Sequence, residues 1–221
     1  MPYPIVTTVT LTAAASATAI ALAQSVGVPG GPLILNGATV TAGVAVLDNP
    51  RRVVIHSNAG DNRAITFAVT GTGGAWLGAA PFTEIVTGAN FAGDAVTARN
   101  FLTVTSIVAS GATSGTVTAG TNTVGSGPWV VWDAYTPNFN VSLYGTVLSG
   151  APTWSVEYTY DDPFGLWLPA NIQSPRPLPF ALMSGQTGSA DGNFNSRVVA
   201  SRLTLTALGS VMLTQQQQGT R

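Results

Sequence analysis

Short runs in which apolar and polar residues alternate, separated by Gly, Asn, Asp and Pro, constrain the fold of this chain more than any other feature. Between positions 64 and 70, Ile65, Phe67 and Val69 fall on one face of an extended strand, and small or polar residues fall on the other. Residues 153–161 repeat this period of two. Such alternation is typical of antiparallel β-structure with one buried face.

The predicted strands recur about every 8 to 14 residues with turn residues between them, a spacing that favours a β-sandwich or barrel over βαβ units. We therefore predict an all-β fold, an antiparallel β-sandwich of jelly-roll-like or immunoglobulin-like type. Residues 53–55 (Val-Val-Ile) are apolar on both faces and predict a central strand. Further strands are predicted at 101–109, 129–132, 139–147 and 202–207. A loop over residues 110–115 predicts a hairpin between the strand at 101–109 and a short strand at 116–118.

The domain organisation follows from the breaks in this pattern. Residues 1–30 are predicted to form an extended N-terminal arm, because Pro29-Gly30-Gly31-Pro32 is a strong break. Residues 31–221 are predicted to form a single β-sandwich domain that closes with a hairpin over 202–214. Within it, residues 163–183 form an extended segment, since five prolines there exclude a helix or an inner strand.

Charged residues make up only 8% of the chain, and Lys is absent, whereas about 25% is usual for a soluble domain. The surface must then consist of Thr, Ser, Asn, Gly and small apolar groups, which protect poorly against self-association. We therefore expect partners to cover much of the surface. A net charge of −1 argues against binding to nucleic acid or to anionic membranes, which require clustered cations. Residues 13–28 lack the features of a signal peptide or a membrane anchor.

Large apolar side chains in the two irregular segments need a surface to cover them, and the segment at 163–183 is predicted to lie either on its own sandwich or on a neighbouring subunit. Prolines keep them out of regular inner strands, yet water is an unfavourable neighbour for so many of them. We therefore expect a homo-oligomer, a dimer or a trimer. The candidate interface residues are Ile5, Val9, Leu11, Phe164, Leu166, Trp167, Leu168, Ile172, Leu178 and Phe180.

Chemical motifs are sparse. The chain has no Cys and one His, so thiol nucleophiles and cysteine metal sites are excluded. His56 is interpreted as a hydrogen-bonded or half-exposed residue at a strand end. The run Asp161-Asp162-Pro163 could hold a cation, but we favour its interpretation as a turn. No catalytic residue, cofactor or metal is predicted. A carbohydrate-binding or glycan-hydrolysing module is the alternative, favoured if Trp76, Trp129 or Trp167 lie exposed in one plane beside a carboxylate.

The stretch from residue 52 to residue 163 resembles the β-rich structural proteins of tailed bacteriophage particles. The resemblance lies in residues 53–72, 84–90, 103–107 and 155–163, and in the closing run 202–207. It implies a non-enzymatic virion component, assembled in the host cytoplasm, that binds the major capsid protein or other virion proteins as a capsid decoration (cement) protein. A tail or neck protein, acting as an adaptor or fibre anchor, is the alternative with the same resemblance.

Overall fold

The structure, a computed structural model, describes residues 4–73, 80–136, 138–163 and 176–218 and is almost entirely β. This confirms the predicted all-β class, and every strand pair given below is antiparallel. Two compact units stand in place of the single sandwich predicted over 31–221. Unit 1 contains the described residues of 4–13 and 125–218, and unit 2 those of 14–73 and 80–124. The alternation of apolar and polar residues shows which face of a strand is buried. It does not show whether the strands share one core or are divided between two, and the prediction of a single sandwich was wrong for this reason.

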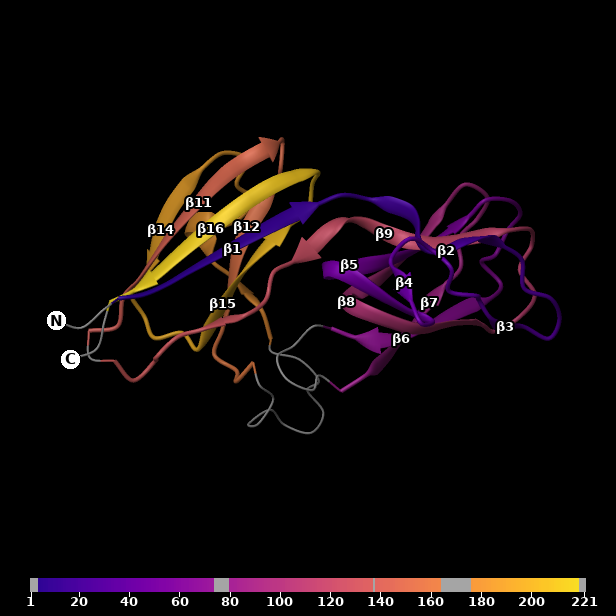
Figure 1. Cartoon of the computed structure of the whole chain (residues 1–221), viewed down its shortest axis with the longest axis horizontal. Helices are drawn as coiled ribbons and strands as arrows, with labels where there is room; N and C mark the ends of the chain where they lie inside the picture. Colours follow the sequence, from indigo (N-terminus) through magenta and orange to yellow (C-terminus); the bar gives the residue numbers. More distant parts are fainter. Residues whose placement is uncertain (1–3, 74–79, 137, 164–175, 219–221) are drawn as a thin grey trace. The chain divides into compact units, whose positions relative to one another are not determined.

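Unit 1 is a β-sandwich of two sheets (Figure 1). One sheet has the order β1-β16-β11-β14, formed by Ile5–Ala13, Gly209–Gln217, Val141–Gly150 and Ala190–Phe194. The facing layer contains β10, β15, β12 and β13, formed by Val130–Val131, Ala200–Leu205, Trp154–Thr159 and Leu178–Pro179. Trp154 lies between the layers and is the largest fully buried side chain of this core.

The chain passes from one layer of unit 1 to the other between β15 and β16. In place of the hairpin predicted over 202–214, β15 pairs with β12 while β16 pairs with β1 and β11. The inward residues are as predicted, since Leu203, Leu205, Val211 and Leu213 are all fully buried. The leucines of β15 and the inward residues of β16 face each other across the sandwich. A chain that arches over a core buries the same alternate positions as a hairpin that lies beside the core, so alternation alone predicts both arrangements.

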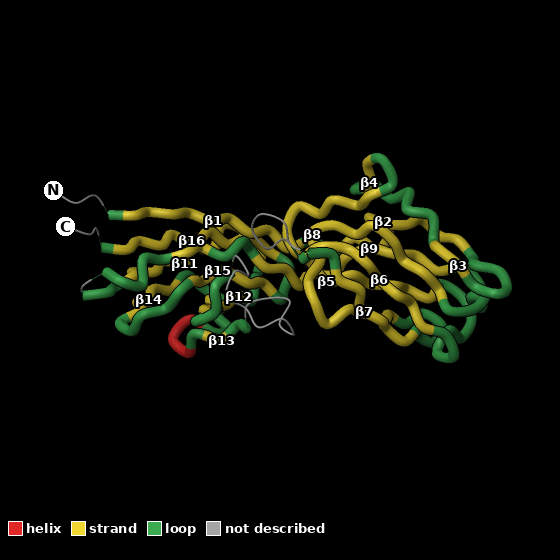
Figure 2. Tube along the Cα trace, turned by 90° about the horizontal axis from the view of Figure 1, so that it is seen from below, coloured by secondary structure: helices red, strands yellow, loops and turns green. Residues whose placement is uncertain are grey.

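Unit 2 contains the strand order β9-β5-β8-β6-β7, with β2 beside β9, β3 beside β8 and β4 beside β5 (Figure 2). In chain order these are β2 Ser16–Gln24, β3 Gly31–Pro32, β4 Val40–Thr41, β5 Val44–Ser57, β6 Thr66–Thr72, β7 Phe82–Thr87, β8 Asp94–Ala109 and β9 Val117–Ser126. Its core contains Phe67, Val69 and Ile107, all fully buried. The hairpin predicted around residues 110–115 does not form, because β5 lies between β8 and β9.

Residues 53–55 lie in the middle of unit 2 as predicted. Val53, Val54 and Ile55 are all buried, and their strand β5 has neighbours on both sides. The β5–β8 register shifts between Arg52 and Val54. There the hydroxyl of Thr97 accepts a hydrogen bond from Val53 N, at 2.9 Å, which satisfies a backbone donor that the shifted ladder leaves without a strand partner.

The two segments predicted to be extended and irregular are partly built into the sheets. Within residues 1–30, residues 5–13 form β1 and residues 16–24 form β2, so most of the predicted arm is regular strand. Within 163–183, residues 164–175 lie outside the described part of the chain. The rest contributes the two-residue strand β13 and the 3₁₀ turn η1, Ala181–Met183, which is red in Figure 2.

Candidate interaction surfaces

The candidate interface residues on β1 divide between core and surface. Val9 and Leu11 point into the core of unit 1 and are buried, whereas Ile5 is 47% exposed. Leu178 is partly exposed on β13, and Phe180 packs against the same core. Phe164, Leu166, Trp167, Leu168 and Ile172 lie outside the described residues. The side chains of Val9 and Leu11 are therefore not accessible to a partner. A contact through this part of the chain has to use the backbone and the exposed residues of β1.

Strand β1 is the edge strand of its sheet. It pairs with β16 without a register shift from Ile5 opposite Gln217 to Ala13 opposite Gly209. Among the strands that the structure describes, no second one pairs with β1. Along its other side Ile5, Val6, Thr8 and Thr10 are exposed, whereas Leu11 is fully buried, so the backbone of β1 can meet a further strand between Ile5 and Thr10.

The outer face of this sheet has no charged side chain on its first three strands. Thr8 on β1 lies opposite Thr214 on β16, which in turn lies opposite Tyr144 on β11. Asp191 on β14, opposite Tyr144, is the first charge along this row. The remaining residues of the face, hereafter the unit 1 face, are Val6, Thr10, Ser142, Thr146, Met212 and Gln216.

A second uncharged face lies on the outside of β6, β7 and β8 in unit 2. Ala68 is in register with Ile85 on one side and with Val108 on the other, so that three apolar side chains form a row across the sheet. Ile85 is 69% exposed. Around this row the face, hereafter the unit 2 face, contains Thr66, Thr70, Thr83, Thr87, Ser106 and Ser110.

The one carboxylate on β7 is turned away from the unit 2 face. Glu84 accepts backbone hydrogen bonds from Ala98 and Arg99 of β8. Arg99 in turn lies over the ring of Phe82, with its guanidinium carbon 5.1 Å from the ring centroid. Glu84 therefore adds no charge to the unit 2 face, which is neutral.

The edge of unit 1 opposite β1 is covered by its own chain. β13 pairs with β12, and the backbone of Gln186 exchanges hydrogen bonds with that of Trp154. Phe180 packs on Phe194 of β14, with ring centroids 4.6 Å apart. Strand β14 is the second edge strand of the sheet that contains β1, and Phe180, next to η1, packs against it.

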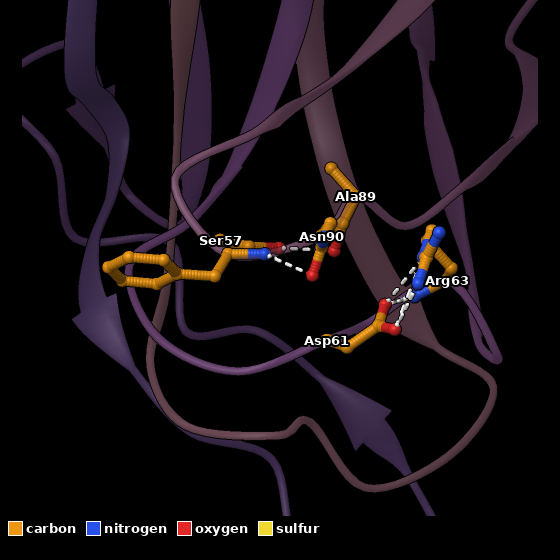
Figure 3. A network of polar contacts seen from close by, with 6 residues as sticks. Ser57, Asp61, Arg63, Ala89 and Asn90 are labelled. Atoms are coloured by element: carbon orange, nitrogen blue, oxygen red, sulfur yellow. Dashed lines mark hydrogen bonds and ion pairs between the residues drawn. The ribbon is translucent and has the colours of Figure 1, made fainter.

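A cluster of loops at one end of unit 2 is held together by the buried side chain of Asn62. Its Nδ2 donates to Ser57 Oγ at 3.1 Å, and its Oδ1 accepts from the backbone N of Ser114 at 2.8 Å. Ser57 Oγ also donates to the carbonyl of Ala89, as seen in Figure 3. Asn62 thus connects the loops at 58–65, 88–93 and 110–116.

His56 lies at the end of β5, as predicted. Its Nδ1 is 2.7 Å from Oδ1 of Asp94, its cross-strand partner in the β5–β8 register. The His56 side chain is partly exposed. The Asp–His pair therefore joins two strands at the surface of unit 2, which confirms the interpretation of His56 as a hydrogen-bonded, partly exposed residue.

Asp161 and Arg176 form an ion pair at the two ends of the segment that lies outside the described residues. Arg176 donates to both carboxylate oxygens, with distances of 2.9 Å from Nε and 2.7 Å from Nη2. These bonds lower the pKa of Asp161 to about 2. The carboxylate of Asp161, which was considered as a cation ligand from the sequence, is thus paired with the guanidinium of Arg176. Among the described residues, no group of three His, Cys, Asp or Glu could hold a metal ion.

The tryptophans that the structure describes belong to the core of unit 1. Trp129, Trp132 and Trp154 are all buried. The guanidinium of Arg202 lies 4.5 Å from the ring centroid of Trp129 and bonds the carboxylate of Glu157. Trp129 is therefore covered and not part of an exposed aromatic plane. Trp76 and Trp167 lie outside the described residues.

Sequence reasoning missed the buried glutamines of β16. Gln215 and Gln217 are both fully buried. Gln217 holds the backbone of Asp133, accepting from its N at 3.0 Å and donating to its O at 2.8 Å. Continued alternation from Val211 and Leu213 places both glutamines on the inward face, and this was the signal that could have found them.

Comparison of the chain with protein-family models, with curated proteins and with solved structures finds no match. No helix in the described part of the chain is long and apolar enough to cross a membrane.

Proposed function

We propose that this protein is a non-enzymatic structural component of a phage particle, which oligomerises and binds the capsid shell as a decoration protein. The observation that carries the proposal is the neutrality of the unit 1 and unit 2 faces. Assignment to a phage particle rests on the resemblance of residues 52–163 to structural proteins of tailed phages.

Uncharged faces can be buried against a protein partner at low cost. Burial of charged groups requires desolvation that a partner must repay with well-placed opposite charges. The centres of protein interfaces are accordingly depleted in charged residues. On the unit 2 face the row formed by Ala68, Ile85 and Val108 supplies apolar contact area, and the surrounding hydroxyls can bond a partner or each other, as Thr70 and Thr83 do at 2.8 Å.

Co-sedimentation with expanded capsids that lack their decoration protein tests this function. We expect the full chain to sediment with such capsids in a saturable manner. Ile85→Lys adds a charge to the centre of the unit 2 face and should weaken binding by about tenfold or more, equivalent to about 1.4 kcal/mol. Ala112→Lys, in the exposed loop at 110–116, is the matched control and should bind as the unchanged protein does.

Two results would overturn the decoration function. A chain that stays monomeric at high concentration and fails to bind the capsids has no partner in the shell. Saturable binding to purified tails or necks in the same assay, without binding to capsids, would favour the tail or neck alternative.

A further inference from the structure

We propose that β1 is the homotypic contact of this protein, and that it pairs antiparallel with β1 of a second copy to give a two-fold symmetric dimer. The inference deepens the proposed function and rests on it, because it names the partner of one surface. It commits to a dimer, since two edge strands that pair with each other leave neither one open for a third copy.

The first support is the length of unpaired edge. From Ile5 to Leu11, β1 is in continuous register with β16, and no other described strand lies on its far side. Its sequence there, Ile-Val-Thr-Thr-Val-Thr-Leu, consists of residues that favour strands. The part of this edge with exposed residues, from Ile5 to Thr10, has no second strand beside it in the described chain and is a template for β-addition.

The second support is that β1 lacks the devices with which proteins usually protect an edge. Such devices are charged side chains, prolines, bulges and covering segments. Strand β1 has no charge, no internal proline and no register shift. By contrast, the edge strands β7 and β14 carry Glu84 and Asp191, and β13, which pairs with β12 in the facing layer, contains Pro179.

The third support is self-complementarity. A two-fold axis through the middle of the strand, at Thr8 or at Val9, places residues of one face opposite residues of the same face in the copy. Val9 and Leu11 then continue the buried side of the sheet, and Thr8 and Thr10 continue the neutral unit 1 face. Cross-strand threonine pairs are favourable, and no like charges meet because β1 carries none.

A charge on the edge strand separates this pairing from other contacts. Thr8→Lys and Thr10→Lys change exposed positions of β1, and each should raise the dimer dissociation constant, measured by analytical ultracentrifugation, by about tenfold or more. Thr214→Lys is the matched control. It adds the same charge on the same face, one strand away from the edge, in register with Thr8. We expect this variant to remain a dimer.

Cysteine cross-linking gives a second measurement that does not depend on weakening the fold. The chain has no cysteine, so a single introduced thiol can link only to a copy of itself. With the axis at Thr8, the Thr8→Cys variant should form a disulfide dimer under mild oxidation. With the axis at Val9, an equal mixture of Thr8→Cys and Thr10→Cys should link instead, because directly opposed strand positions meet the geometry of a disulfide. Thr214→Cys should not link.

The two proposals fail in distinguishable ways. A wild-type chain that is monomeric but sediments with capsids overturns β1 pairing and leaves the decoration function standing. A chain that forms β1-linked dimers but binds no capsid supports the pairing and overturns the decoration function. Dimers that persist unchanged in Thr8→Lys, with no cross-link from either cysteine arrangement, also overturn the pairing.

Discussion

Ser201 on β15 donates a hydrogen bond from Oγ to Oε1 of Gln215 on β16 over 2.6 Å, and both side chains are fully buried. The two strands belong to different layers of unit 1, so the bond crosses the core. The same hydroxyl accepts a hydrogen bond from Nε1 of Trp132 at 2.9 Å. Three polar groups that are costly to bury thus satisfy one another and fix how the two layers face each other.

Replacement of the shared hydroxyl should be strongly destabilising. Ser201→Ala leaves the Trp132 N–H and the Gln215 oxygen buried without their partner, and we expect the free energy of unfolding to fall by about 1 to 3 kcal/mol. Urea denaturation measures this change. Ser142→Ala, on the exposed side of β11, is the control and should change stability little. Equal effects of the two substitutions would contradict a structural role for the network.

The other partner should be less sensitive to replacement. Nε2 of Gln215 is buried and has no hydrogen-bond partner among the described residues. Gln215→Met removes one hydrogen bond, but it also removes this unpaired donor, so the two effects partly offset each other. We expect a smaller loss in urea denaturation than for Ser201→Ala. A larger loss would indicate that the amide is satisfied in solution.

Gly145 on β11 makes room for the indole of Trp154. A Cβ at this position would lie 2.1 Å from Cη2 of the Trp154 ring, which is fully buried and cannot move aside cheaply. Gly145→Ala should therefore lower the free energy of unfolding by about 1 to 3 kcal/mol through overpacking. Gly188→Ala, where an added Cβ meets nothing within 4 Å, is the control. Its stability in the same denaturation experiment should stay near that of the unchanged protein.

The faces of the strands could be predicted from the sequence, whereas the pairing of the strands could not. The alternation around Leu203 and Leu213 correctly identified the inward positions on both strands. Alternation reports only which side of a strand is apolar, and a strand in the opposite layer of a sandwich buries that same side. The arch between β15 and β16 was therefore indistinguishable from a hairpin by pattern alone.

The candidate surfaces show the same limit. Val9 and Leu11 were predicted as contact residues because they are large and apolar, but they are buried in the core of unit 1 as part of β1. The place of β1 at the edge depends on β16, which begins almost 200 residues later. The buried link made by Asn62 could not be predicted from the sequence either, because the fold alone brings together its partners, Ser57 at the end of β5 and Ser114 in the loop at 110–116.

Loss of the Asn62 side chain should loosen the loop cluster of unit 2. Asn62→Ala removes one bond to Ser57 Oγ and one to Ser114 N, and it leaves a gap at a buried position. We expect a loss of about 2 kcal/mol in unfolding free energy and faster amide hydrogen exchange at residues 110–116. Asn90→Ala, an exposed neighbour in the same cluster (Figure 3), should change neither. Unaltered exchange at 110–116 in Asn62→Ala would show that the loops hold without this link.

Acid should destabilise the protein through its arginine-bonded carboxylates. Hydrogen bonds from Arg176 and Arg63 lower the pKa values of Asp161 and Asp61 to about 2, from the ordinary carboxyl value of 3.8. Because the folded pKa is the lower one, the stabilisation is present above the unfolded pKa and is lost as the pH falls through the folded value. The free energy of unfolding should thus decline between about pH 4 and about pH 2.

Asp161→Asn should make this decline with pH shallower. Asp191→Asn, at an exposed position outside the described ion pairs, is the control and should leave the slope of the decline unchanged. Equal slopes in urea titrations of Asp161→Asn and the unchanged protein would show that the Asp161–Arg176 pair does not persist in solution.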